Sequence, residues 1–116
     1  MKELYIYCAG GFGKEVMDVA RRLNVSKPKW SNIHFLDDIS LDSFKYGAKV
    51  HKLDDLLPSG AMTRGEVVIA NGEPVVREKL FDRLAANGVP MGVVVDVSTL
   101  IADTAILEHG VVITPL

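Results

Sequence analysis

The chain has 116 residues, a formal net charge of −2 and hydrophobic residues at 48% of its positions. This length is enough for one domain with a modest core, and this apolar content is typical of a globular α/β protein and argues against disorder. The sequence shows neither a basic stripe for nucleic acid nor an apolar run near the roughly 18 residues of a membrane span. A nucleotide ligand is compatible with this charge, because backbone amides bind phosphate without net positive charge.

Cys8 is the single cysteine, so the chain has no disulfide of its own. The apolar run that opens the sequence is too short for a signal peptide. The spacing of histidine and cysteine residues does not indicate a zinc site. We therefore expect a cytoplasmic protein without a metal, a nucleic-acid partner or a membrane partner.

The first predicted unit is a strand, a glycine turn and a helix. Residues 4–8 form a short apolar run of β-forming residues, as in a buried strand, and Gly10, Gly11 and Gly13 follow. Apolar residues then recur at helical spacing as far as Leu23, which indicates an amphipathic helix.

The middle of the chain predicts a second strand and two short elements. Residues 33–36 form the strand, and the weakly patterned residues 39–47 are expected to be a loop. Residues 48–53 predict a short edge strand. Residues 54–57 then predict a single helical turn that Pro58 stops.

One helix and two strands complete the predicted sheet. Residues 66–70 form a strong strand, and Pro74 begins a helix, since its missing N–H is harmless at the first helical position. Asn87-Gly88 caps this helix, and residues 92–96 form the last strand. Because strands alternate with helices, we expect residues 1–97 to form a small Rossmann-like α/β domain with a parallel sheet and flanking helices.

The tail, residues 98–116, follows a different pattern. Blocks of six residues begin at Ile101, Leu107 and Ile113, each with an aliphatic residue in the lead. A six-residue period of this kind is typical of a β-helix. A coil needs three blocks, and the sequence contains two and most of a third, so we expect one incomplete coil.

The glycine turn is the first candidate for a ligand site, because ligands of parallel α/β sheets bind at the carboxyl ends of the strands. Gly10 can let the backbone approach a phosphate, and Gly13 can let the helix pack closely on the sheet. The amides of Gly11, Phe12 and Gly13 would point from a helix N-terminus at an anion. A full dinucleotide fingerprint has glycine at the position of Cys8, and a glycine turn without a ligand explains these residues equally well.

Two further loops are predicted at the same edge of the sheet. The carboxylates of Asp37 and Asp38 are placed to accept hydrogen bonds from a ribose or from the N–H of uracil. A solvated loop or a cap for the next turn is the alternative. Backbone groups of Ala70, Asn71 and Gly72 are candidates for contact with a sugar or diphosphate, and a simple turn with a helix cap is the alternative there.

The remaining singular side chains are expected to be structural. His34 lies in a predicted strand, His51 at a surface edge and Trp30 at a sheet edge. Cys8 is expected to be a small buried residue. His109 occupies a polar position of a hexapeptide block, and no catalytic set of serine, histidine and aspartate can be assembled.

With these motifs in this order, the chain resembles the NeuD/PglD family of bacterial sugar acyltransferases, which modify sialic acids and UDP-amino sugars. The matching segments are residues 6–16, 35–38, 69–74 with Arg77 and Lys79, and 98–115. The resemblance implies a Rossmann-like domain that holds a nucleotide-sugar, in which Asp37 and Asp38 read the uracil. The residues implied on the phosphate side are Ala9, Gly10, Gly11 and Phe12.

The resemblance also implies a C-terminal left-handed β-helix that trimerises, binds acetyl-CoA between subunits and carries a catalytic histidine as general base in a later coil. Because the sequence ends at Leu116, we expect those coils and the acetyl-CoA site to be absent and this chain alone to be inactive. His109 lies too early to be that histidine. Cys8 and Asp96 depart from the family, which usually has glycine and histidine there.

The sequence therefore favours the nucleotide-sugar-binding domain of an acetyl-CoA-dependent sugar O- or N-acyltransferase of polysaccharide biosynthesis. A small NAD(P)-binding domain is a second interpretation. It fits the glycine turn and the acidic residues downstream, but it fits neither the incomplete fingerprint nor the hexapeptide tail. A non-catalytic regulatory or assembly module is the third.

Overall fold

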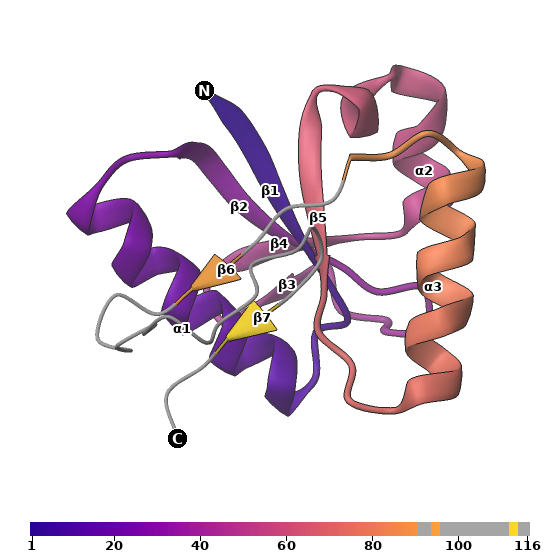
Figure 1. The fold of residues 1–116 in the computed structure, drawn as a ribbon, viewed down its shortest axis with the longest axis horizontal. Helices are drawn as coiled ribbons and strands as arrows, with labels where there is room; N and C mark the ends of the chain where they lie inside the picture. Colours follow the sequence, from indigo (N-terminus) through magenta and orange to yellow (C-terminus); the bar gives the residue numbers. More distant parts are fainter. Residues whose placement is uncertain (91–93, 96–111, 114–116) are drawn as a thin grey trace, which may run out of the picture.

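The computed structural model describes residues 1–90, 94–95 and 112–113. Five strands form one sheet in the order β3-β4-β2-β1-β5, with helices on both faces (Figure 1). Among the described residues, no helix is both long and apolar enough to cross a bilayer.

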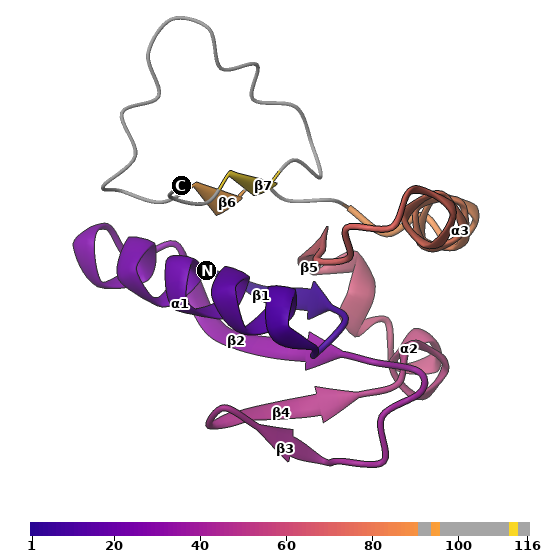
Figure 2. The same cartoon turned by 90° about the horizontal axis from the view of Figure 1, so that it is seen from below.

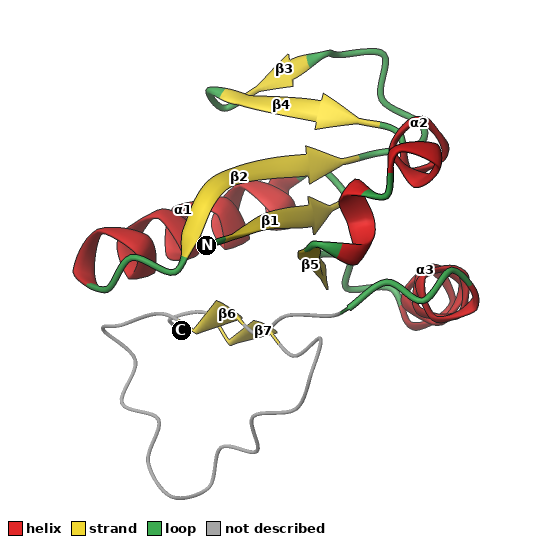
Figure 3. Cartoon of the chain, turned by 90° about the horizontal axis from the view of Figure 1, so that it is seen from above, coloured by secondary structure: helices red, strands yellow, loops and turns green. Residues whose placement is uncertain are grey.

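An interior strand of the sheet is β1 (Lys2–Tyr7). It pairs in parallel with β2 (Trp30–Leu36) on one side and with β5 (Gly65–Ile69) on the other. On its far side β2 pairs in parallel with β4 (Ala48–His51), and the short β3 (Phe44–Lys45) runs antiparallel to β4. Figure 3 shows β1, β2 and β4 pointing the same way. The predicted α/β architecture with a parallel sheet is confirmed.

Each face of the sheet has its own core, because successive side chains of a strand point to opposite faces. Leu4 and Ile6 of β1 pack under α1 (Gly11–Ser26), whose apolar face is buried. Tyr5 and Tyr7 point to the other face, which carries α2 (Leu53–Leu56) and α3 (Pro74–Ala86). Two 3₁₀ turns, Leu57–Ser59 and Ala61–Thr63, connect α2 to β5.

The stretch expected to be a loop over residues 39–47 contains a strand. Phe44–Lys45 form β3, which returns to β4 through a two-residue turn at Tyr46 and Gly47. Both turn residues have positive φ, 51° and 75°, as the tight hairpin turns that match strand twist require. β4 is therefore not the edge strand that the sequence predicts, and it ends at His51.

The second strand begins earlier than predicted, at Trp30. This residue is 2% exposed and packs in the core below α1 instead of lying at a sheet edge. Its indole N–H donates to the carboxylate of Glu66 on β5 at 2.9 Å. The prediction for Trp30 was wrong because the polar residues Ser31 and Asn32 interrupt the apolar pattern, so the strand was expected to begin only at residue 33.

The strand predicted over residues 92–96 is not part of the five-stranded sheet. Instead β6 (Val94–Val95) pairs in parallel with β7 (Val112–Ile113) and lies near α1 (Figure 2). The chain meets the free edge of β5 earlier, where the N–H of Val67 donates to the Pro90 carbonyl at 2.9 Å. The predicted β-helix coil falls mostly outside the described residues, as do Asp96 and His109, and the boundary at residue 97 stays a prediction.

Candidate functional site

The three loops predicted to hold a ligand lie together at the carboxyl edge of the sheet. Tyr7 is in register with Leu36 of β2 and Ile69 of β5, so the three strands end at one level. Just beyond them, the N–H of Cys8 donates to the Leu36 carbonyl at 2.6 Å and that of Ala70 to the Tyr7 carbonyl at 2.9 Å. The structure therefore brings residues 8–13, 37–38 and 70–73 side by side.

The glycine loop opens α1. Gly10 is the N-cap, and the N–H of Lys14 donates to its carbonyl at 2.9 Å. Gly11, Phe12 and Gly13 come before Lys14 in the helix, so the helix offers their amides no acceptor of its own. These amides lie at the positive end of the helix dipole. The first turn of α1, all of it described, carries no acidic side chain of its own, but the charged carboxylate of Asp37 lies beside it and accepts the N–H of Ala9 at 3.0 Å. The turn therefore offers helix N-terminal amides to an anion next to one aspartate.

The glycines of this turn have different steric surroundings. A Cβ atom on Gly13 would lie 2.1 Å from the carbonyl oxygen of Cys8, so a side chain there forces α1 away from β1. Gly10 and Gly11 are exposed, and a Cβ on either meets no protein atom within 4 Å. Gly13 thus serves helix packing, while Gly10 and Gly11 leave open space beside the amides.

Cys8 adopts a backbone conformation that favours glycine, with φ at +89°. Its side chain is half-buried, and its Sγ lies 3.7 Å from Nδ2 of Asn71. Burial raises the pKa of the thiol, and the nearby Asp37 and Asp38 raise it further, against the opposing contact from Asn71. A protonated thiol of this kind is a poor nucleophile, which agrees with the structural role expected for Cys8.

Asp37 binds the glycine loop to the loop that follows β2. Its Oδ2 accepts the N–H of Ala9 at 3.0 Å, and its Oδ1 accepts those of Ile39 and Ser40 at 3.0 and 2.9 Å. Burial alone would raise the pKa of this carboxyl, but the three backbone donors outweigh it and hold the pKa below the usual value. Asp37 is therefore a charged link between two of the three loops.

Asp38 points to the opposite face of the sheet and anchors both helices there. Its Oδ1 accepts the N–H of Leu53 at 3.1 Å, at the start of α2. Its Oδ2 accepts the hydroxyl of Tyr7 and Nη1 of Arg83, the latter at 3.0 Å. Burial raises the pKa of Tyr7, and the bond to Asp38 raises it further. If Asp38 binds the base of a nucleotide, its carboxylate must do so in addition to these three hydrogen bonds.

The third loop is held by its own side chain. Oδ1 of Asn71 accepts the N–H of Glu73 at 2.9 Å, which fixes the entry into α3. Across the ten predicted site residues, exposure differs widely: Gly10, Gly11 and Gly72 are exposed, Phe12, Asp37, Asp38 and Asn71 are half-buried, and Ala9, Gly13 and Ala70 are buried. Their contact with a ligand stays a prediction.

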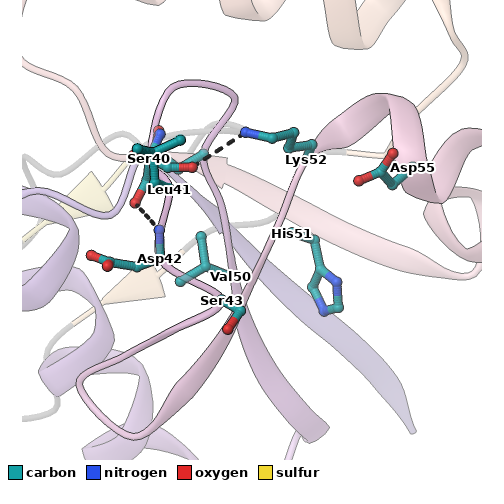
Figure 4. A pocket seen from close by; sticks show the side chains of 9 residues that line it. Ser40, Leu41, Asp42, Ser43, Val50, His51, Lys52 and Asp55 are labelled. Carbon is teal, nitrogen blue, oxygen red and sulfur yellow. Dashed lines mark hydrogen bonds between the residues drawn. The ribbon is translucent and has the colours of Figure 1, made fainter.

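A pocket of about 230 Å³ lies next to Asp37, between the loop after β2 and the end of β4 (Figure 4). Val50 gives it an apolar wall, and the exposed Leu41 lies at its mouth. The polar groups of the lining come from Ser40, Ser43 and His51 and from the carboxylates of Asp37, Asp42 and Asp55. The ammonium of Lys52 donates to the carbonyls of Ser40 and Asp38, both at 3.2 Å, and so fixes the rim. The sequence does not predict this pocket, because residues 39–47 are weakly patterned and were expected to be a loop.

The imidazole of His51 is part of an aromatic stack on the face that carries α2. It lies edge-on to His34 with ring centres 5.3 Å apart, and His34 stacks on Tyr5 at 5.0 Å. Burial lowers the pKa of His51, and the neighbouring His34 and Lys49 lower it further. His51 is thus a half-buried pocket wall, not the surface-edge residue expected. His34, bonded to Glu3 at 3.1 Å, is placed for the structural role expected of it.

Within the described residues, no three His, Cys, Asp or Glu side chains gather where they could hold a metal ion.

Residues 3–84 match the family model of the PglD N-terminal domain. The chain belongs to this family. The resemblance to the NeuD/PglD acyltransferases is therefore confirmed for the N-terminal domain.

Two solved structures share the fold of this PglD-type domain. The acetyltransferase domain of PglB from Neisseria gonorrhoeae FA1090, in complex with acetyl coenzyme A, is 26% identical with a TM-score of 0.82, over 97% of this chain and 53% of that one. PerB from Caulobacter crescentus, in complex with CoA and GDP-perosamine, is 20% identical with a TM-score of 0.76, over 98% of this chain and 52% of that one. This chain spans about half the length of each.

Proposed function

We propose that this chain is the nucleotide-sugar-binding domain of an acetyl-CoA-dependent sugar O- or N-acyltransferase. The observation that carries the proposal is the sterically open N-terminus of α1, which offers its amides beside a pocket at the same sheet edge. Family membership supports it, as do the structural neighbours. One of them is a complex with CoA and a nucleotide-sugar, GDP-perosamine.

In this proposal the diphosphate lies against the amides of Gly11 and Phe12. Helix N-termini bind phosphate in this way, and the missing side chain of Gly10 leaves room for it. The base enters the pocket against Val50, and the pocket volume of about 230 Å³ has room for a planar ring. In this proposal the base is uracil, as expected from the sequence, and guanine is the alternative.

The carboxylate of Asp37 then has two roles. A carboxylate has about four acceptor positions, and backbone amides occupy three of those on Asp37. The remaining one is available to the ribose or the base. Acetyl-CoA binding, trimer formation and the catalytic histidine are assigned to the β-helix part of the enzyme, and sialic acid stays one candidate acceptor among several.

Isothermal titration with UDP-sugars, GDP-sugars, NAD and acetyl-CoA tests the proposal. We expect a nucleotide-sugar to bind and NAD not to bind. Gly10→Val should weaken nucleotide-sugar binding at least about tenfold, because its Cβ meets no protein atom within 4 Å and its side chain would fill the space beside the amides. The smaller Gly10→Ala should give an intermediate loss.

Thermal unfolding confirms that each Gly10 variant is folded before its affinity is compared. A folded Gly10→Val protein with the affinity of the wild type would show that phosphate does not approach this turn. Binding of NAD in place of nucleotide-sugars would favour the dinucleotide-binding interpretation.

A further inference from the structure

Arg83 of α3 joins three parts of the chain that are distant in sequence. Its Nη1 donates to Oδ2 of Asp38 at 3.0 Å, and its Nη2 donates to Oδ1 of Asp54 on α2 at 2.5 Å. The same Oδ2 of Asp38 accepts the hydroxyl of Tyr7, a residue that is 1% exposed at the end of β1. A planar guanidinium held by two carboxylates has a fixed orientation.

The position of Asp38 in turn determines the position of the candidate ligand site. Asp38 follows Asp37 directly, and Asp37 holds the amides of Ala9, Ile39 and Ser40. The Asp38 carbonyl also accepts Nζ of Lys52 at the rim of the pocket. A shift of Asp38 therefore moves both the glycine loop and the pocket loop.

The ion pair between Arg83 and Asp38 is partly shielded from solvent. The side chains are 34% and 27% exposed, so water screens this pair less than it screens a fully exposed one. Both donors of Arg83 described above point to protein carboxylates on the face of α2 and α3. The phosphate-facing amides of α1 lie at the sheet edge, on a different element.

We propose that Arg83 is a positioning residue for nucleotide-sugar binding. It fixes Asp38, and through Asp38 the loop from Asp37 to Ser40, without touching the ligand. The inference rests on the proposed function for its effect on affinity, but its effect on the loop is independent of any ligand.

The test compares Arg83→Met and Arg83→Lys with Arg77→Met, a control at an exposed position of the same helix. The ligand is the UDP- or GDP-sugar that the wild type binds. We expect Arg83→Met to weaken its binding by about tenfold, an effect of the size found for substitutions that do not contact the ligand. Arg83→Lys should restore part of the affinity, because lysine keeps the charge but cannot bridge both carboxylates. Arg77→Met should bind as the wild type does.

A double-mutant cycle separates this route from general destabilisation. If Arg83 acts through Asp38, Arg83→Met should cause no further loss of affinity in an Asp38→Asn background. Fully additive losses, or unchanged affinity in a folded Arg83→Met or Arg83→Lys protein, would overturn the proposal.

Hydrogen exchange without ligand provides the second readout. The amides of Ala9, Ile39, Ser40 and Leu53, which bond to the two aspartates, should exchange faster in Arg83→Met and at the wild-type rate in Arg77→Met. If the wild-type chain binds no nucleotide-sugar, the proposed function fails, and this measurement alone decides the positioning role. Equal exchange rates in Arg83→Met and the wild type would then reject it.

Discussion

At the scale of single residues, the glycines in the turn from β1 to α1 differ in the space around them. Gly10 and Gly11 face empty space, whereas Gly13 lies directly over the carbonyl of Cys8. Cys8 itself has φ at +89°, where a side chain is strained. Strain of this kind clusters at ligand sites, and here it lies at the first residue of the candidate phosphate loop.

Cys8→Gly should stabilise the protein by about 0.5–1 kcal/mol. Relief of the positive φ gains about 1–2 kcal/mol, and the greater freedom of glycine in the unfolded chain offsets part of that gain. Chemical denaturation gives the free energy of unfolding. Cys8→Ala is the matched control, because it removes the thiol and keeps the Cβ; a glycine variant no more stable than this control would show that the backbone here is unstrained.

The roles of the two aspartates show what single residues in a sequence do not reveal. Their position after a strand, next to a glycine turn, was predictable from the pattern. Their partners were not, because Asp38 meets Arg83, which lies 45 positions away, and Asp37 meets the amide of Ala9, 28 positions away. Contacts of this range depend on the register of three strands and on the placement of α3.

At the scale of elements, the strongest predictions came from the longest periodic segments. α1 and α3, together with β1 and β5, have apolar patterns or caps that predict them within a few residues. β3 escaped prediction because it is two residues long and its turn places a tyrosine, not an asparagine, at positive φ. The pocket between the loop after β2 and the end of β4 was not predicted for the same reason.

The packing of α1 on β1 gives a prediction at this scale. Gly13→Ala should destabilise the protein by about 1–3 kcal/mol, because the added Cβ would overlap the Cys8 carbonyl at 2.1 Å. Gly11→Ala, two positions earlier, should leave stability unchanged or raise it slightly, since its Cβ meets no protein atom and alanine favours helix. Equal unfolding midpoints for the two variants would contradict the close helix–strand contact.

At the scale of the whole molecule, Asp37 and His51 are among the ionisable groups that connect the stability of the fold to pH in the same direction; Glu3, whose pKa is also lowered, is another. The pKa of Asp37 lies below its ordinary value of 3.8, so its contribution is complete above that pH and disappears as the pH falls through the folded value. The pKa of His51 lies below 6.5, so the unfolded chain takes up this proton first. Acidification below 6.5 therefore favours unfolding until the folded imidazole is also protonated.

We expect the free energy of unfolding to decrease in two steps as the pH falls from 7.5, one beginning near 6.5 and one below about 4. His51→Gln should reduce the upper step, because glutamine stays neutral among His34, Lys49, Glu3 and Asp55, the charged or titratable groups that act on His51. Asp37→Asn should reduce the lower step. Urea denaturation across this range, followed by the fluorescence of buried Trp30, measures both. A His51→Gln protein that keeps the full upper step would place the responsible proton on another group.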